Sequence, residues 1–145
     1  MIEDNPSPLT KLDFEALSTF RYQLRKFLRF SEEAAQANGV TPQQYLLLLH
    51  VKGFPGRDWA TIGELAERLQ SQHHSVVALV SRCEKLKLVQ RRTSEIDRRQ
   101  VNVHLLSAGE RCLATLASLH HEELNTLTDT FRVPHINFKI NHEFS

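Results

Sequence analysis

The spacing of apolar residues changes at Leu88, and this change constrains the fold more than any other feature of the sequence. Before Leu88, apolar side chains recur every three or four residues, as they do on one face of an α-helix. Residues 101–105 instead alternate between apolar and polar, as in a half-buried strand, and 89–93 can pair with them across the polar loop 94–99. The sequence therefore predicts a mainly α fold with a small β-wing.

Two helices separated by a tight break precede this hairpin. Thr61 to Glu64 has the spacing of a capping box, in which a hydroxyl and a carboxylate satisfy the first amides of a helix, and it opens a helix of about nine residues. After Gln70 and Ser71, a second helix is predicted from Gln72 to about Lys87. Its buried stripe is predicted to be Val76, Leu79, Val80, Cys83 and Leu86. Two helices joined in this way are a candidate helix-turn-helix.

Three further helices are predicted around this unit. A long amphipathic helix over 13–37 ends at Asn38-Gly39, and a capping box at Thr41 to Gln44 opens a second helix that is apolar on nearly every side. A third capping box, Ser107 to Glu110, is expected to open a helix that continues to about Phe131. Its stripe has the spacing of a packing seam between helices: Leu113, Leu116, His120, Leu124, Leu127 and Phe131. Residues 132–145 are interpreted as a tail.

Length and composition favour one compact protein of the cytoplasm. A chain of 145 residues is long enough for one domain, here 1–145, and too short for two ordinary ones. The N-terminus lacks the features of a secretory signal, and the longest apolar run, 46–49, is far too short to span a membrane. Two cysteines without a CxxC pair suit a reducing compartment and indicate neither a disulfide framework nor a metal pair.

Positive charge is gathered in one segment although the net charge is only +1. Seven arginines and lysines lie from Arg82 to Arg99, opposed by three acidic residues. On charge alone, such clustering is compatible with nucleic-acid binding or with an ordinary solvated face. The motifs of nucleophilic hydrolases, P-loops and dinucleotide sites are absent from the sequence, so we expect no enzyme activity.

The predicted helix-turn-helix presents side chains that suit the edges of bases. A helix held at a surface fits the major groove, which is about 12 Å wide. Glutamine can pair with adenine and arginine with guanine, and small residues permit close approach. The predicted DNA-contacting residues of this helix are Gln72, His73, His74, Ser75, Ala78 and Arg82. Arg98 and Arg99 in the hairpin are candidates for a narrow minor groove, with Asp97 positioning one of them through a salt bridge.

Several segments resemble the MarR family of bacterial regulators. The similar segments are 39–45, 65–69, 75–89, 97–105 (Asp97-Arg98-Arg99 and the strand after it) and 108–109. The resemblance implies a homodimer with two winged helix-turn-helix lobes, approximately 57–106 in each chain, joined by the dimerisation helices 13–37 and 107–131. It also implies a transcription regulator, typically a repressor, that responds to a small aromatic effector or to cysteine oxidation.

Carried onto this chain, the resemblance makes Gln72, His73, His74, Ala78 and Arg82 the recognition surface, and Asp97 with Arg99 the wing pair. Two positions depart from the family pattern. Gln70 stands where the turn usually has glycine, so a residue with a side chain must adopt a left-handed backbone. Leu106 stands where a threonine usually caps the next helix, so Ser107 is expected to provide the cap.

The sequence is also compatible with functions other than DNA regulation. The winged helix could contact an acidic protein instead of DNA. Cys83 or Cys112 could sense oxidants, although Cys83 occupies a predicted core position, and no metal is expected because the cluster at His120 lacks a paired histidine at helical spacing. An effector pocket is expected where the first helix, the second helix and the DNA-binding lobe converge. Its candidate residues, for which ordinary core packing is the alternative, are Leu24, Phe27, Leu28, Leu49, His50 and Trp59.

Overall fold

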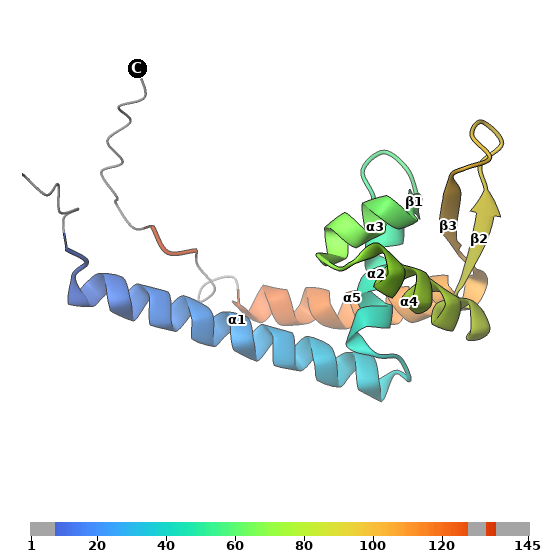
Figure 1. Ribbon diagram of the computed structural model, residues 1–145. Helices are drawn as coiled ribbons and strands as arrows, with labels where there is room; N and C mark the ends of the chain where they lie inside the picture. Colours follow the sequence, from blue (N-terminus) through green and yellow to red (C-terminus); the bar gives the residue numbers. More distant parts are fainter. Residues whose placement is uncertain (1–7, 128–132, 136–145) are drawn as a thin grey trace, which may run out of the picture.

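The computed structural model describes residues 8–127 and 133–135, which form five helices and three strands. Helix α1 (Lys11–Ala37) and helix α5 (Ser107–Leu127) run side by side, and the remaining elements form a lobe at one end of this pair (Figure 1). The lobe holds α2 (Pro42–Lys52), β1 (Trp59–Thr61), α3 (Ile62–Leu69), α4 (His73–Lys85), β2 (Val89–Thr93) and β3 (Val101–Leu105). Phe131 and most of the predicted tail lie outside the described residues.

Capping boxes fix where three of the helices begin. The predicted boxes at Thr41 and Thr61 are confirmed, with the hydroxyl of each accepting from the backbone N–H three residues later. A box at Thr10 and Asp13 starts α1 two residues before the predicted position 13. This start was missed because an aspartate, rather than a glutamate or glutamine, stands at its third helical position.

The predicted capping box at Ser107 is wrong. Helix α5 begins at Ser107 itself, and the Leu106 carbonyl accepts from the backbone N–H of Glu110 at 2.9 Å, which places Leu106 at the cap position. The Glu110 carboxylate instead accepts from Lys52 Nζ on α2 at 3.2 Å. The backbone of Leu106 is fixed separately, because its N–H donates to the Leu88 carbonyl at 2.9 Å.

The predicted hairpin is confirmed, and a third strand completes the sheet. Strand β3 lies in the centre, antiparallel to β2 and to β1, so that the order is β1-β3-β2. Within it Ala60 pairs with Val103, and both side chains are fully buried. Strand β1 was not predicted, because three residues are too few to show an alternating pattern.

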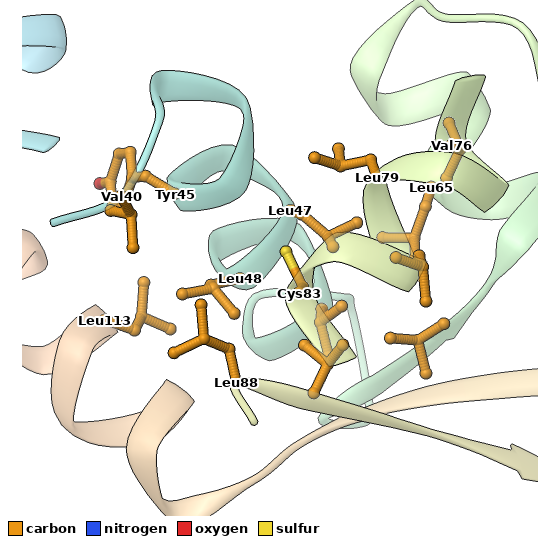
Figure 2. Packing of buried hydrophobic residues seen from close by; sticks show 14 of the residues in the cluster. Val40, Tyr45, Leu47, Leu48, Leu65, Val76, Leu79, Cys83, Leu88 and Leu113 are labelled. Carbon is orange, nitrogen blue, oxygen red and sulfur yellow. The ribbon is translucent and has the colours of Figure 1, made fainter. Parts of the chain in front are cut away.

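The core is organised around α2, as its apolar sequence predicted. Leu47 points toward Leu79 and Cys83 of α4, whereas Leu48 points toward Leu88 and Leu113 (Figure 2). Because α2 packs on both α4 and α5, it joins the lobe to the long helices. Helix α2 is therefore buried on several of its sides.

Leu86 was wrongly assigned to the buried stripe of α4. Its side chain is 51% exposed because the helix ends at Lys85, and Lys87 then adopts a left-handed backbone with φ of 58°. This turn carries Leu88 into the core in its place. Leu124, at the far end of the predicted α5 seam, is exposed as well.

His120, part of the predicted packing seam of α5, is buried between helices of one chain. One ring nitrogen, Nδ1, lies 2.6 Å from the Leu116 carbonyl, and the other, Nε2, lies 2.8 Å from Ser31 Oγ on α1. The ring stacks on Tyr45 of α2 with a centroid distance of 4.6 Å. His120 therefore joins α1, α2 and α5 of the same subunit.

In the described part of the chain, no helix is long and apolar enough to cross a membrane.

Candidate nucleic-acid interface

Helix α4 presents the predicted recognition residues on one open face. Gln72, His73, His74, Ser75 and Arg82 are exposed and Ala78 is half-buried. The opposite face of the helix, represented by Val76 and Val80, is buried in the core. The structure therefore brings the predicted α4 residues together on a surface that a large ligand can approach.

The turn before α4 sets the direction of this face. Gln70 adopts the expected left-handed conformation, with φ of 50° and ψ of 45°, and its side-chain amide donates to the Glu67 carbonyl at 2.7 Å. The side chain of Gln72 makes no cap hydrogen bond, and the Gln72 carbonyl accepts from the backbone N–H of Ser75 at 3.1 Å, so the amides of His73 and His74 at the start of α4 can donate to an external acceptor. A phosphate is a suitable acceptor at such a helix end.

Hydrogen bonds order the tip of the wing, which is the β2–β3 hairpin with its loop 94–99. Ser94 Oγ accepts from the backbone N–H groups of Ile96 at 3.3 Å and Asp97 at 3.2 Å. Ser94 and Gln100 also bond across the base of the loop, with the Ser94 N–H donating to the Gln100 carbonyl at 3.0 Å. The loop is thus a defined turn that projects from the sheet.

Asp97 positions the wing in a different way from the salt bridge expected. Its Oδ1 accepts from the backbone N–H of Arg99 at 3.0 Å, and it takes part in none of the ion pairs formed by the described residues. The carboxylate therefore shapes the turn, and the guanidinium groups of Arg98 and Arg99 remain on exposed side chains. Asp97 acts on the backbone rather than on arginine charge.

Two hollows flank α4, so that this helix stands out between them. The hollow on the wing side has a volume of about 530 Å³ and is lined by His73 and Val77 of α4, by Gly63 of α3 and by Asp97 and Arg99 of the wing. The hollow on the other side, of about 610 Å³, includes Gln43 and Leu46 of α2, together with Gln72, His74 and Arg82. A surface of this shape suits an elongated ligand that lies along α4.

Arg91 has a structural role that the charge pattern did not reveal. Its guanidinium pairs with Glu84 and donates to the Val77 carbonyl at 2.8 Å and to Ser81 Oγ at 2.9 Å. All three partners lie on α4, so Arg91 fastens β2 to the recognition helix. Within the charged cluster over 82–99, Arg91 and Glu84 therefore form an ion pair with each other.

A second arginine, Arg57, anchors the start of α3. Its guanidinium carbon lies 4.3 Å from the centroid of Phe54 and 3.9 Å from that of Trp59, and it pairs with Glu64. Partial burial alone would raise the pKa of Glu64, but bonds from Thr61 and the charge of Arg57 lower it. Phe54 and Trp59 are close to Arg57 in the sequence, but spacing along the chain does not reveal its pairing with Glu64 on α3.

Among the three hollows described, one includes two of the six predicted effector residues, and the other two include none. Leu24 and Leu28 border a hollow of about 500 Å³ whose other lining residues, Arg21, Tyr22 and Arg25, also lie on α1. Among the remaining candidates, Phe27 meets His120 edge-on and Leu49 packs on the core. Trp59 stacks on His104 of β3, and His50 is half-buried on α2.

Neither cysteine has the properties of a reactive thiol. Cys83 is fully buried, and this burial raises the pKa of its thiol to about 11. Burial also raises the pKa of Cys112. A protonated thiol is a weak nucleophile, so both positions favour a packing role. Within the described ranges, no group of three or more histidine, cysteine or acidic side chains is arranged to hold a metal ion.

Comparison with known proteins gives concordant results for sequence and fold. Residues 38–100 match the sequence profile of the MarR family. The chain is 32% identical over 98 residues to an uncharacterised HTH-type transcriptional regulator, YsmB, of Bacillus subtilis, a match covering 63% of this chain and 61% of that protein. The chain thus spans less than two thirds of the length of the curated relatives it matches.

Solved structures share the fold. AbsC, a MarR family transcriptional regulator from Streptomyces coelicolor, superposes with a TM-score of 0.72 at 23% identity, over 88% of this chain and 86% of AbsC. The MepR–DNA complex of Staphylococcus aureus superposes with a TM-score of 0.60 at 22% identity, over 76% of this chain and 88% of MepR. The arrangement of α3, α4 and the wing is therefore that of known winged-helix proteins.

Proposed function

We propose that this chain is a sequence-specific transcription regulator of the MarR family that binds double-stranded DNA as a homodimer, because residues 38–100 match the profile of that family and solved MarR structures share its fold. The observation that carries the proposal is the single exposed surface formed by the outer face of α4 and the tip of the wing. The solved MepR–DNA complex, which has the same fold, supports the choice of ligand. The proposed activity is binding rather than catalysis, and we place it in the cytoplasm.

In the proposed complex α4 enters the major groove and the wing enters the minor groove. Gln72 suits adenine and Arg82 suits guanine, while Ser75 and Ala78 are small enough to let the helix approach. His73 and His74 can donate to bases or phosphates. Arg98 and Arg99 suit a narrow minor groove, where the negative potential is strongest. Arg91 lines the hollow between α4 and the wing, but its donors are directed to α4, so we assign it no contact with DNA.

The homodimer is supported by uncovered apolar side chains on the part of α1 that extends beyond the lobe. Leu12, Phe14, Leu17 and Tyr22 are exposed there, and Leu124 is exposed on α5. A second copy covering these side chains would place two lobes on one face of a duplex. The operator would then be pseudo-palindromic, with half-sites centred about 34 Å apart or a multiple of it.

We further propose that an anionic aromatic effector controls this regulator, which acts as a repressor. The hollow beside Leu24 and Leu28 on α1 has the required chemistry, since it combines apolar walls with Arg21 and Arg25. An effector there changes DNA affinity only if it binds differently to the DNA-bound and free forms. A rise in melting temperature with aromatic acids that disappears in Arg25→Gln tests this part of the proposal.

The main experiment measures binding of fluorescent DNA from the region flanking the coding sequence at several salt concentrations. Arg99→Ala is expected to weaken binding to all sequences and to reduce the dependence of affinity on salt, because it removes one positive charge close to the DNA phosphates. His74→Ala and Arg82→Ala are expected to reduce discrimination between sites by about 1 to 3 kcal/mol. Arg111→Ala, an exposed arginine on α5, is the matched control.

Equal affinity of wild type and all three lobe variants would contradict DNA regulation. It would favour the alternative in which the winged helix contacts an acidic protein. The oxidant-sensing alternative predicts that peroxide lowers DNA affinity and that replacing Cys83 or Cys112 with serine removes the effect. Burial of both thiols argues against that result.

A further inference from the structure

Ile96 at the tip of the wing has no apparent role in the folded chain. Its side chain is 100% exposed, more than any other described large apolar residue. Single exposed apolar residues are common on protein surfaces, so exposure alone carries little weight. The position of Ile96, at the apex of the element that carries Arg98 and Arg99, makes it informative.

The backbone holds Ile96 outward before any ligand arrives. Its N–H donates to Ser94 Oγ at 3.3 Å, and the Gln100 N–H donates to the Asp97 carbonyl at 3.0 Å on the other side of the apex. Asp97 Oδ1 then bonds the Arg99 N–H. Because these bonds already fix the turn, little backbone freedom remains to be lost when the tip meets a partner.

The chemistry of the apex does not suit phosphate. Isoleucine offers no donor, and its neighbours Glu95 and Asp97 are acidic, whereas the basic residues begin at Arg98. The apolar surfaces of a duplex are the sugar edges and base steps of the minor groove, where other DNA-binding proteins insert aliphatic side chains. The order of residues along the tip therefore separates an apolar contact at its apex from a charged one at its base.

We infer that Ile96 is a minor-groove contact residue, which packs against sugar edges at the point where Arg99 enters the groove. This inference rests on the proposed DNA-binding function and adds an uncharged contact to it. Such a contact depends on the shape of the groove, so it favours the narrow minor groove of A·T-rich sequence at the wing position.

The test compares Ile96→Ser and Ile96→Val with wild type in the salt-dependent binding experiment. Ile96→Ser is expected to lower operator affinity about fivefold to tenfold, because it removes aliphatic surface of which binding would bury a part. The slope of affinity against salt stays at the wild-type value because no charge changes, in contrast to Arg99→Ala. Ile96→Val is expected to restore most of the affinity.

Leu86→Ser is the matched control, since it removes another exposed leucine-sized side chain from the same lobe. It is expected to bind DNA as wild type does. Both serine variants should melt at the wild-type temperature. Replacing A·T by G·C pairs under the wing should weaken wild type more than Ile96→Ser.

If wild type binds DNA and Ile96→Ser binds it with the same affinity, the inference is overturned and the proposed function still holds. An equal loss in Leu86→Ser, or a reduced salt slope in Ile96→Ser, also overturns it, because the effect would then be unspecific or electrostatic. Absence of DNA binding by wild type would overturn the proposed function together with the inference.

Discussion

Gly109 in the first turn of α5 lies against the backbone of Leu88, and no larger residue fits there. A Cβ atom at this position would be 2.1 Å from the Leu88 carbonyl oxygen, which also accepts from the Leu106 N–H. Gly109→Ala is therefore expected to reduce the free energy of unfolding by at least about 1 to 3 kcal/mol, the usual effect of overpacking. Urea denaturation measures this change.

Gly63→Ala is the matched control for this substitution. A Cβ atom at Gly63 meets nothing within 4 Å, and the residue lies near the start of α3 without a left-handed backbone. Its replacement is expected to leave stability unchanged or to raise it by up to about 1 kcal/mol. Equal unfolding free energies for the two alanine variants would contradict the close packing described for Gly109.

Two partly buried histidines make stability depend on pH. Burial lowers the pKa of His50 and of His104 from 6.5, with a further lowering from Arg68 at His50 and from Arg92 at His104. The unfolded chain therefore binds protons more readily than the folded one as the pH falls below about 6.5. The unfolding free energy is expected to decrease over this range and to be unaffected by these residues above it.

Unfolding in urea at pH 7.5 and pH 5.5 measures this dependence. The double replacement of His50 and His104 by glutamine should show a smaller loss at the lower pH. Glu64 adds a separate effect at more acidic pH, because its lowered pKa makes its contribution disappear as the pH falls below 4.5. A double variant with the same loss between pH 7.5 and 5.5 as wild type would exclude both histidines as the cause.

At the scale of secondary-structure elements, Arg57 joins the loop after α2, strand β1 and helix α3. It lies between two aromatic rings and pairs with Glu64, whose carboxylate also accepts from the Thr61 N–H at 3.0 Å. Arg57→Gln is expected to lower the unfolding free energy by about 1 to 2 kcal/mol through loss of the ion pair and of the stacking. Trp59, the only tryptophan, should change its emission.

The pair Arg29–Glu33 on α1 is the control for this prediction. It has ordinary geometry, at 3.1 Å, but both side chains are largely exposed, at 79% and 66%. Exposed pairs contribute little, so Arg29→Gln is expected to change stability by less than about 0.5 kcal/mol. If Arg57→Gln were equally mild, the loop would not depend on the arginine between its rings.

The elements differ in how far the sequence could predict them. The helix starts at Thr41 and Thr61, the left-handed Gln70 and the hairpin depend on neighbours a few residues away, and these predictions are confirmed. Strand β1 and the roles of Arg57 and Arg91 depend on contacts between separate elements, which spacing along the chain does not reveal. The predicted burial of Leu86 is wrong because the left-handed backbone at Lys87 ends the helical spacing on which the prediction relied.

The sequence predicted which residues are exposed at the candidate site better than it predicted the contacts they make. Exposure of the α4 residues follows from helical periodicity, and exposure of the wing residues follows from the polar loop between two predicted strands. The use of Asp97 for the backbone, and the scattered positions of the six effector candidates, follow from three-dimensional packing. Their functional roles stay predictions until DNA and effector binding are measured.

At the scale of the whole molecule, the exposed apolar part of α1 predicts that the chain associates with itself. Phe14→Glu combined with Tyr22→Glu places two charges on this surface, and burying an unpaired charge is strongly unfavourable. The double variant is expected to be monomeric in light scattering and to bind a two-half-site operator much more weakly than wild type. Its lobe should keep its secondary structure, as circular dichroism can check.

A substitution on the same helix serves as control. Gln36→Glu adds a charge at an exposed position near the C-terminal end of α1, next to the lobe. We expect it to remain dimeric. A double variant that remained dimeric at micromolar concentration would place the subunit contact elsewhere.

The central position of β3 has a consequence for the kind of duplex that the protein can accept. The strand is bonded on one side to β1, which runs directly into α3, and on the other to β2, which Arg91 fastens to α4. Helix and wing therefore cannot be adjusted separately, and the separation between them is a property of the folded chain. A double-stranded RNA, whose major groove is deep and narrow, would not admit α4 next to a wing held at that separation.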